Sequence, residues 1–302
     1  MGISIHLSEL ILREHKYKSL PNKLCTVGRP FMGYGEAQMM DMFKRNCFSP
    51  KPYRIKFDDY TTESKNSSHR GRERFISDRT FFDALGVQEV QAIDISDYEG
   101  AEIVLNLNEP LADEYENTAE AIVGGSTLDN VFDPAQYLRN MARMLKPGGR
   151  LIEVNHINNH LRPYVMPSPS WYYDYFVVNK FEDCKIYIIE HSNAVHAYGL
   201  MVGYNPDQQV GWGLIDNFDC DENYVVTAIV IAEKGEHSTF EKTPTQDSYR
   251  NEEEINKYNE NLLHILENNR SYEEFIRDDI GSMNIKKHTP PRNYHYLGHF
   301  RI

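Results

Sequence analysis

The chain lacks two features that would narrow its class at once, a patterned set of cysteines and a long apolar run. Its four cysteines show no CxxC spacing, which argues against a zinc site and against a disulfide framework. Polar residues interrupt the early apolar positions at His6, Glu9, Arg13 and Glu14. We therefore expect a soluble, cytoplasmic protein that contacts no membrane and holds no metal.

Positive charge is also scarce. The sequence holds 32 Lys and Arg residues against 45 Asp and Glu residues, a net charge of −13. Because duplex DNA is held largely through phosphate contacts, we do not expect a chain this acidic to bind nucleic acid. One basic cluster departs from the trend, and we interpret it as a solvated loop. It consists of Lys65, His69, Arg70, Arg72, Arg74 and Arg79.

Apolar residues, by contrast, are plentiful: 40% of the 302 residues are hydrophobic and 12% are aromatic, enough for a large core. Segment 131–156 carries the clearest pattern. Its apolar residues recur at three- and four-residue steps and predict one buried helix face. These are Tyr137, Leu138, Met141, Met144 and Leu145. Lys146 is expected at the carboxyl end of this helix, Pro147-Gly148-Gly149 in the turn that stops it, and residues 151–154 in a strand.

The same kind of pattern predicts the other elements. Helices are predicted at residues 4–16, 36–44, 73–85, 168–181, 252–268 and 272–280. Strands are predicted at residues 23–28, 90–95, 103–107, 119–123, 184–190 and 224–233. Residues 46–72 are predicted to be an insertion, and the last residues of the sequence to be irregular. Strands that alternate with helices or crossover loops imply an α/β fold with a parallel, doubly wound sheet covered on both faces.

Several segments together resemble the class I S-adenosylmethionine (SAM)-dependent methyltransferases. They are the helix and turn written LKPGG, the strand VQAIDI that ends beside Asp94, and the string GSTLDN after the fourth strand. The resemblance is closest to members linked to surface-glycan and secondary-metabolite pathways. It implies a mostly parallel seven-stranded sheet with an antiparallel last strand. It also implies a helix at 1–22, a methyltransferase-like domain at 23–235 and a helical extension at 236–302.

The resemblance implies a cofactor site at the carboxyl ends of the strands. Asp94 would accept hydrogen bonds from the ribose hydroxyls, with Asp97 as a competitor and a turn cap as the alternative role. Gly28 and Gly33 would approach the methionine part of SAM, although their spacing departs from the compact GxGxG of the family. Asn106 and Leu107 would flank the adenine, or simply form the turn before Pro110.

The resemblance also places candidate residues near the transferring methyl group. Gly125 and Ser126 would lie beside the methyl group, with Asp129 as a candidate base. His156 is the other candidate base, because a histidine titrates near neutral pH, and hydrogen bonding within its own loop is the alternative role. His160, Tyr172 and Tyr173 are the candidate substrate-binding residues. The two tyrosines fit equally an aromatic stripe of the core.

The resemblance thus implies an enzyme that transfers a methyl group from SAM to an oxygen or nitrogen of a small polar acceptor, such as a sugar or a related metabolite. The alternative is a catalytically inactive methyltransferase-like protein that serves binding or assembly. A nucleotide-dependent Rossmann enzyme is a third hypothesis, which the missing GxGxxG disfavours. The expected partners are a small-molecule acceptor and a second copy of the chain. Three roles stay open for residues 236–302: a lid over the site, a dimer contact, or packing against the sheet.

Overall fold

The computed structural model describes residues 2–66, 74–157, 163–192, 198–204, 224–268 and 294–301. The chain divides into two compact units, residues 1–153 and residues 154–302, and each is described by itself. The predicted domain limits near residues 22 and 235 do not coincide with this division and stay a prediction.

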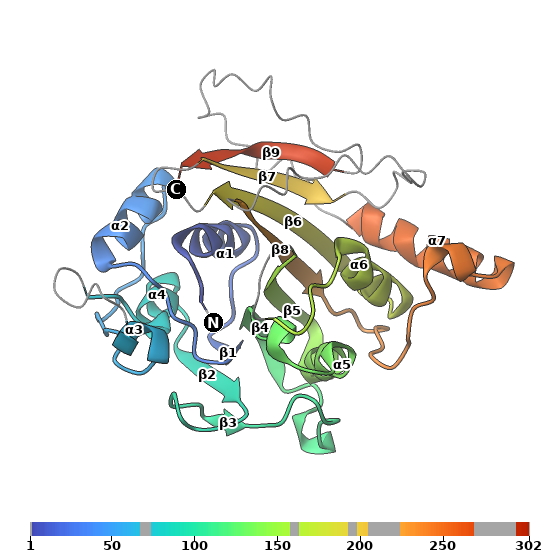
Figure 1. Cartoon of the computed structure of the whole chain (residues 1–302), viewed down its shortest axis with the longest axis horizontal. Helices are drawn as coiled ribbons and strands as arrows, with labels where there is room; N and C mark the ends of the chain where they lie inside the picture. Colours follow the sequence, from blue (N-terminus) through green and yellow to red (C-terminus); the bar gives the residue numbers. More distant parts are fainter. Residues whose placement is uncertain are drawn as a thin grey trace. The chain divides into compact units, whose positions relative to one another are not determined.

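The first unit is built on neighbouring parallel strands. β1 (Lys23–Val27) pairs in parallel with both β2 (Glu89–Asp94) and β4 (Ala119–Gly125), and β2 pairs in parallel with the short β3 (Ile103–Val104). The strand order is β3-β2-β1-β4-β5, where β5 (Leu145–His156) continues past the limit of the unit (Figure 1). An order that runs outward in both directions from β1 marks a doubly wound Rossmann-like α/β fold.

Three helices of the first unit begin where the sequence supplies a side-chain cap. The side chains of Ser4, Ser77 and Asp133 accept hydrogen bonds from the first-turn amides of α1, α4 and α5. α4 ends at Gly86, whose φ of 94° lies in the left-handed region that favours glycine. The helices are α1 (Ile5–Tyr17), α2 (Glu36–Arg45), α3 (Thr62–Asn66), α4 (Asp78–Leu85) and α5 (Pro134–Met144), with 3-10 turns η1 (Asp113–Tyr115) and η2 (Leu128–Asn130).

A buried ion pair ties α1 to β5 within the first unit. Arg150 Nη1 lies 3.6 Å from Glu14 Oε2, and both side chains are almost fully buried. Arg150 Nη2 also donates to the carbonyl oxygens of Lys18 at 2.6 Å and Ser19 at 3.2 Å, just beyond the helix. Because a buried charge needs a partner, this contact fixes where the end of α1 lies against the strand.

The second unit contains antiparallel strands. β6 (Asp183–Ser192) pairs with β8 (Tyr224–Glu233) along its whole length and with β7 (Tyr198–Tyr204), which in turn pairs with β9 (Tyr294–Arg301). The strand order of this unit is β8-β6-β7-β9. Its helices are α6 (Pro169–Val178) and α7 (Glu252–Asn268), with a 3-10 turn η3 (Asp247–Tyr249).

The predicted fold class is confirmed. All seven predicted strands exist, the sheet of the first unit is parallel, and the late pair β6 and β8 is antiparallel. β7 and β9 are two further strands: the first lies in the glycine-rich connection, and the second in the tail predicted to be irregular. Both were missed because glycine in β7, and glycine and histidine in β9, weaken the period-two pattern on which a strand prediction depends.

Several predicted limits were wrong. α4 starts at Asp78 rather than near residue 73, because Ser77 provides the cap. The predicted strand 103–107 is only two residues long, and the insertion at 46–72 contains the short helix α3. α5 ends at Met144, so Leu145, Lys146 and the Pro-Gly-Gly turn are the first residues of β5. The helix predicted at 272–280 lies outside the described residues.

Two further findings concern the described residues alone. Among them, no helix is both long and apolar enough to cross a membrane. The part of the chain that the structure describes also brings no three His, Cys, Asp or Glu side chains together in a metal-binding arrangement.

The cysteines differ sharply in predicted reactivity. Burial raises the pKa of the Cys25 thiol to about 11 and that of the fully buried Cys184 well above its ordinary value, whereas Cys47 is exposed. Since the thiolate is the nucleophile, iodoacetamide at mildly alkaline pH should label Cys47 in the native protein and leave Cys25 and Cys184 unmodified. Peptide mass spectrometry before and after denaturation measures this. Equal native labelling of Cys25 and Cys47 would contradict the burial of β1.

Candidate functional site

Three loops meet at the carboxyl ends of the strands in the first unit. The Gly28 amide donates to the Ile93 carbonyl oxygen at 2.6 Å, which puts the turn after β1 directly beside the end of β2. The Thr127 hydroxyl donates to the Val27 carbonyl oxygen at 2.8 Å, which brings the loop after β4 to the same place. In an open α/β sheet this edge is where ligands bind.

The loop between β1 and α2 uses its glycines for conformation. Gly28 has a φ of 73° and Gly33 a φ of 68°, both in the left-handed region, and Gly35 is the N-cap of α2. A Cβ on Gly33 would also lie 3.2 Å from the ring of Phe31. The predicted assignment of KLCTV as the first strand, with the glycine loop directly after it, is therefore confirmed, while contact of these glycines with a cofactor stays a prediction.

Arg29 occupies the start of this loop and is almost fully buried. Its guanidinium lies 3.1 Å from Asp78 and 2.8 Å from Glu102, and it donates to the Gly100 carbonyl oxygen at 2.7 Å. Arg79 forms a further ion pair with Glu102. The sequence analysis missed Arg29 as a site residue, although its position directly after Gly28 was the available signal.

Burial and the neighbouring charges together shift the pKa values of Asp78 and Glu102 in opposite directions. Burial raises the pKa of Asp78, and the nearby Arg29 offsets only part of that rise. For Glu102, burial would raise the pKa, but the Ala92 amide and the guanidiniums of Arg29 and Arg79 together lower it. The ion pairs of this network therefore link the loop after β1 to the start of α4 and to the segment before β3.

Asp94 is the last residue of β2 and is half-buried. One of its carboxylate oxygens accepts from the Ile95 amide at 2.6 Å, as in the turn-cap alternative. The structure gives its other oxygen no partner within the described part of the chain, so this oxygen remains available to a ligand hydroxyl. Asp97, the competing acid, is exposed three residues beyond the end of the strand, on the same loop.

Asn106 and Leu107 lie in the turn after β3. Asn106 is exposed, and its side-chain oxygen accepts from the Asn108 amide at 3.2 Å, which is the predicted turn alternative. Leu107 is buried, and its carbonyl oxygen accepts from the Asn140 side chain of α5 at 3.1 Å. Contacts of either residue with an adenine ring stay a prediction.

The loop after β4 is held together by Asp129. Ser126 Oγ donates to Asp129 Oδ2 at 2.7 Å, and Asn130 Nδ2 donates to Asp129 Oδ1 at 2.7 Å. Asp129 is almost fully buried, and Ser126 has a φ of 67°. Both oxygens of this carboxylate already order the loop, and the role of Asp129 as a base stays a prediction.

The start of the chain lies across two of these loops. The Ile3 amide donates to the Phe31 carbonyl oxygen at 2.8 Å, and Ile3 is fully buried. A Cβ on Gly125 would lie 3.4 Å from the Gly2 carbonyl oxygen and 3.5 Å from Ile3 Cγ1. Residues 2 and 3 therefore contact both the glycine loop and the loop after β4.

The remaining candidate residues belong to the second unit. His156 is half-buried at the end of β5, with Nδ1 3.5 Å from the Thr227 hydroxyl. Tyr172 and Tyr173 are almost fully buried on α6, as in the core alternative, and the Tyr172 hydroxyl accepts from Asn155 at 2.6 Å. His160 lies outside the described residues. The catalytic and substrate-binding roles of these residues stay predictions.

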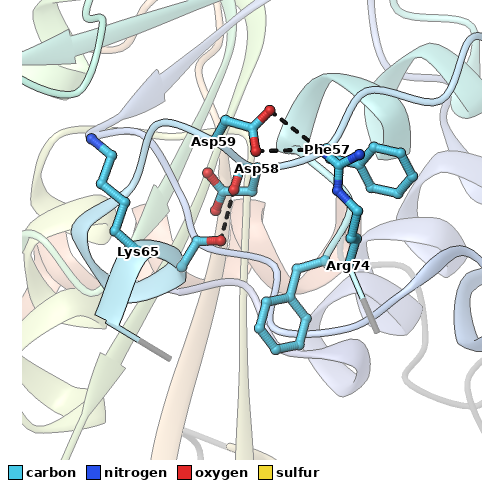
Figure 2. Close-up of a pocket in the computed structure, with 7 residues that line it drawn as sticks. Phe57, Asp58, Asp59, Lys65 and Arg74 are labelled. Atoms are coloured by element: carbon cyan, nitrogen blue, oxygen red, sulfur yellow. Dashed lines mark hydrogen bonds and ion pairs between the residues drawn. The ribbon is translucent and has the colours of Figure 1, made fainter. Parts of the chain in front are cut away.

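A cavity of about 260 Å³ lies in the insertion of the first unit (Figure 2). Phe57 and Phe75 provide apolar walls, and Arg74 covers the Phe57 ring at 3.9 Å while its Nη2 lies 3.4 Å from Asp59. Lys65 lines the same cavity, and its ammonium group lies 5.6 Å from the ring centre of Tyr98. Two members of the basic cluster seen in the sequence are thus cavity residues.

Contacts join this cavity to the strand-end loops. The ring of Phe75 meets that of Phe31, in the glycine loop, edge to face at 5.2 Å. The amide and hydroxyl of Thr62, at the start of α3, both donate to Glu99, in the loop after β2, at 2.7 Å. The cavity therefore borders both the loop after β1 and the loop after β2.

Neither a family model nor a curated protein matches the sequence. Similar solved structures include the citrinin polyketide synthase CMeT domain, with 14% identity and a TM-score of 0.35 over 76% of this chain and 52% of that one. The chain thus spans about half the length of that structure.

Two more similar structures match over most of their own length. A Burkholderia thailandensis 1,6-didemethyltoxoflavin-N1-methyltransferase, crystallised with S-adenosylhomocysteine, has 10% identity and a TM-score of 0.34 over 76% of this chain and 78% of its own. The [4+2]-cyclase SpnF has 10% identity and a TM-score of 0.36 over 76% of this chain and 80% of its own. At such values the fold rests on the strand order of the chain itself, and these likenesses add no argument on activity.

Proposed function

We propose that the chain is a SAM-dependent methyltransferase that acts on an oxygen or nitrogen of a small polar acceptor. One observation carries the proposal: the hydrogen bond from Gly28 to Ile93 puts a left-handed glycine turn directly beside Asp94 at the carboxyl edge of the sheet. The carboxylate of Asp94, which can accept hydrogen bonds from hydroxyl groups, thus lies next to a backbone turn that a ligand can approach closely. The resemblance of the sequence supports the same residues.

The residues of the site would act mainly by alignment. Bound SAM supplies an electrophilic methyl group, and transfer is an in-line displacement that depends strongly on the orientation of the reactants. The free oxygen of Asp94 would fix the ribose, while Ser126 and Asp129 keep the loop after β4 in one conformation. A half-buried histidine such as His156 could accept the proton that an oxygen nucleophile releases.

The cavity in the insertion supports a small polar acceptor. Its lining combines the phenyl rings of Phe57 and Phe75 with the charges of Asp59, Lys65 and Arg74. Aromatic faces pack on the apolar face of a sugar, and exposed charges bind its polar substituents. A sugar or a related metabolite is therefore the acceptor class that we propose.

Titration calorimetry with SAM and S-adenosylhomocysteine tests this function directly. Asp94→Ala should weaken binding roughly tenfold to a hundredfold, because it removes a charge-assisted hydrogen bond to the ribose. Asp97→Ala is the matched control, and it should bind as the unchanged protein does. Equal affinities for both variants would reject the assignment of Asp94, and a folded protein that binds neither ligand at millimolar concentration would reject the function.

A second candidate function follows from the protein groups that pack against the strand-end loops. The guanidinium of Arg29 and the backbone of residues 2 and 3 are tied by hydrogen bonds and close contacts to the loops at this edge. These contacts fit a catalytically inactive methyltransferase-like protein that serves binding or assembly. The same calorimetry separates the two functions, because the inactive protein would bind neither SAM nor its product.

A further inference from the structure

A second cavity, of about 530 Å³, lies within the second unit between the end of α6 and the first turns of α7, two helices that pack against each other. This volume falls in the range of small-molecule pockets. Figure 1 shows α6 and α7 and the segment that leads into α7. The residues that line the cavity include Lys180, Lys242, Arg250, Glu254, Lys257 and Tyr258.

The frame of the cavity is fixed by partly buried hydrogen bonds and an ion pair. Asn179, fully buried at the end of α6, donates to the Lys242 carbonyl oxygen at 2.9 Å and accepts from the Lys242 amide at 3.1 Å. Arg250 stacks on the Tyr258 ring at 3.7 Å, and its Nη2 lies 2.7 Å from Asp174. Because both ends of the connecting segment are held, the cavity is formed before any ligand arrives.

Lys180 is held in an unusual backbone conformation. Its φ of 57° lies in the left-handed region, directly after the residue that caps α6. Glycine is the residue that fits this position without strain, and the chain uses glycine at the corresponding end of α4, at Gly86. Cys47 has the same left-handed conformation directly after the residue that caps α2, so this conformation belongs to the way the helix ends and fixes where the Lys180 side chain leaves it.

Four cationic side chains line the cavity, against the two carboxylates of Glu254 and Glu260. Arg250 is paired with Asp174, Lys257 with Glu253, and Glu254 accepts hydrogen bonds from Thr245 and Asn251. Lys180 and Lys242 are exposed, and no acidic side chain pairs with either ammonium group among the described residues. In a chain with a net charge of −13, two such lysines at one rigid cavity are attractive to an anion.

We propose that this cavity binds a small phosphate-bearing metabolite, with Lys180 and Lys242 as the residues that hold its phosphate oxygens. A phosphate accepts hydrogen bonds from several donors at once, and a lysine ammonium group provides up to three. The site is independent of the strand-end loops of the first unit, so it can exist whether or not the chain transfers methyl groups.

Calorimetry with inorganic pyrophosphate tests the site, and phosphorylated sugars test whether a larger molecule carries the phosphate. Lys180→Gly and Lys242→Ala should each weaken pyrophosphate binding about tenfold, the loss of one charge-assisted hydrogen bond. Lys44→Ala, an exposed lysine of α2, should leave the affinity unchanged. Binding should also weaken as salt is raised.

Lys180→Gly has a second readout that a merely structural lysine would not give. Because glycine relieves the left-handed strain, the variant should unfold at a higher temperature than the unchanged protein while it binds pyrophosphate less tightly. A loss of binding with raised stability supports the proposal. Undetectable pyrophosphate binding by the unchanged protein at low millimolar concentration, or equal affinity in the lysine variants and Lys44→Ala, would overturn it.

Discussion

Arg29→Met should destabilise the first unit by about 3 to 5 kcal/mol, the usual cost of leaving one partner of a buried ion pair without the other. Only 4% of the Arg29 side chain and 1% of the Asp78 side chain are exposed, so water cannot replace the guanidinium. Methionine fills much of the same volume, which limits the loss of packing. Urea unfolding at neutral pH measures the change in the free energy of unfolding.

Arg79→Met is the matched control. Arg79 pairs with Glu102, as Arg29 does, but the two side chains of that pair are about one third exposed. Exposed pairs contribute less than about 1 kcal/mol, so the control should stay close to the unchanged protein. Similar losses of stability in Arg29→Met and Arg79→Met would contradict the argument that the burial of Arg29 makes its ion pair the stronger one. Asp78→Asn added to Arg29→Met should recover part of the lost stability, because it removes the unpaired charge.

The pH dependence of Arg29→Met follows from Asp78. Burial already raises the pKa of Asp78, and loss of Arg29 removes the main opposing effect, so the pKa should rise further. A carboxyl whose pKa is higher in the folded than in the unfolded state contributes stability at low pH, and this contribution is lost as pH rises through the folded pKa. The difference in the free energy of unfolding between the variant and the unchanged protein should therefore become smaller as the pH falls from neutral to acidic.

Gly124→Ala should destabilise the same unit by about 2 to 4 kcal/mol, through overpacking and a disturbed buried hydrogen bond. A Cβ at position 124 would lie 2.0 Å from Oε2 of Glu153, which is fully buried in β5. That oxygen accepts from the Tyr137 hydroxyl of α5 at 2.7 Å, so it cannot turn aside without straining the contact between helix and strand. Thermal or urea unfolding measures the loss.

The neighbouring glycine provides the control. At Gly125 the added Cβ would meet the Gly2 carbonyl oxygen and Ile3 Cγ1 at ordinary contact distances, so Gly125→Ala should change stability by less than about 1 kcal/mol. In a Glu153→Ala background the cost of Gly124→Ala should nearly vanish, because the colliding carboxylate is gone. An unchanged cost in that background would show that Glu153 is not the cause.

The sequence predicted a helix or strand well where the apolar pattern of that segment is enough to define it. The helix face around Tyr137 and Met141 and the apolar runs of β2, β4 and β8 have a clear period, so their strands and helices could be placed within a few residues. β7 and β9 could not be placed, because a strand rich in glycine and histidine is stabilised by its neighbours in the sheet rather than by its own pattern.

The candidate site was predicted less completely for the same kind of reason. Asp94 and Gly28 could be found, since each stands at the end of a recognisable strand. The pairing of Arg29 with Asp78 and Glu102 could not, because it joins residues 49 and 73 positions apart in the sequence. The buried carboxylate of Asp129 shows the converse: the residue type suggested a base, but only the contacts with Ser126 and Asn130 reveal its part in ordering a loop.

The contact between Arg150 and the end of α1 has a consequence for the order in which the chain acquires structure. α1 precedes every strand of the first unit along the chain, yet the Lys18 carbonyl oxygen just beyond it accepts a hydrogen bond from a residue 132 positions later. Contacts of such long sequence separation form late and slow the folding of a domain. A nascent chain that stops before Arg150 thus exposes an amphipathic helix whose Glu14 lacks its cation, and such a chain is a target for chaperones until β5 has been synthesised.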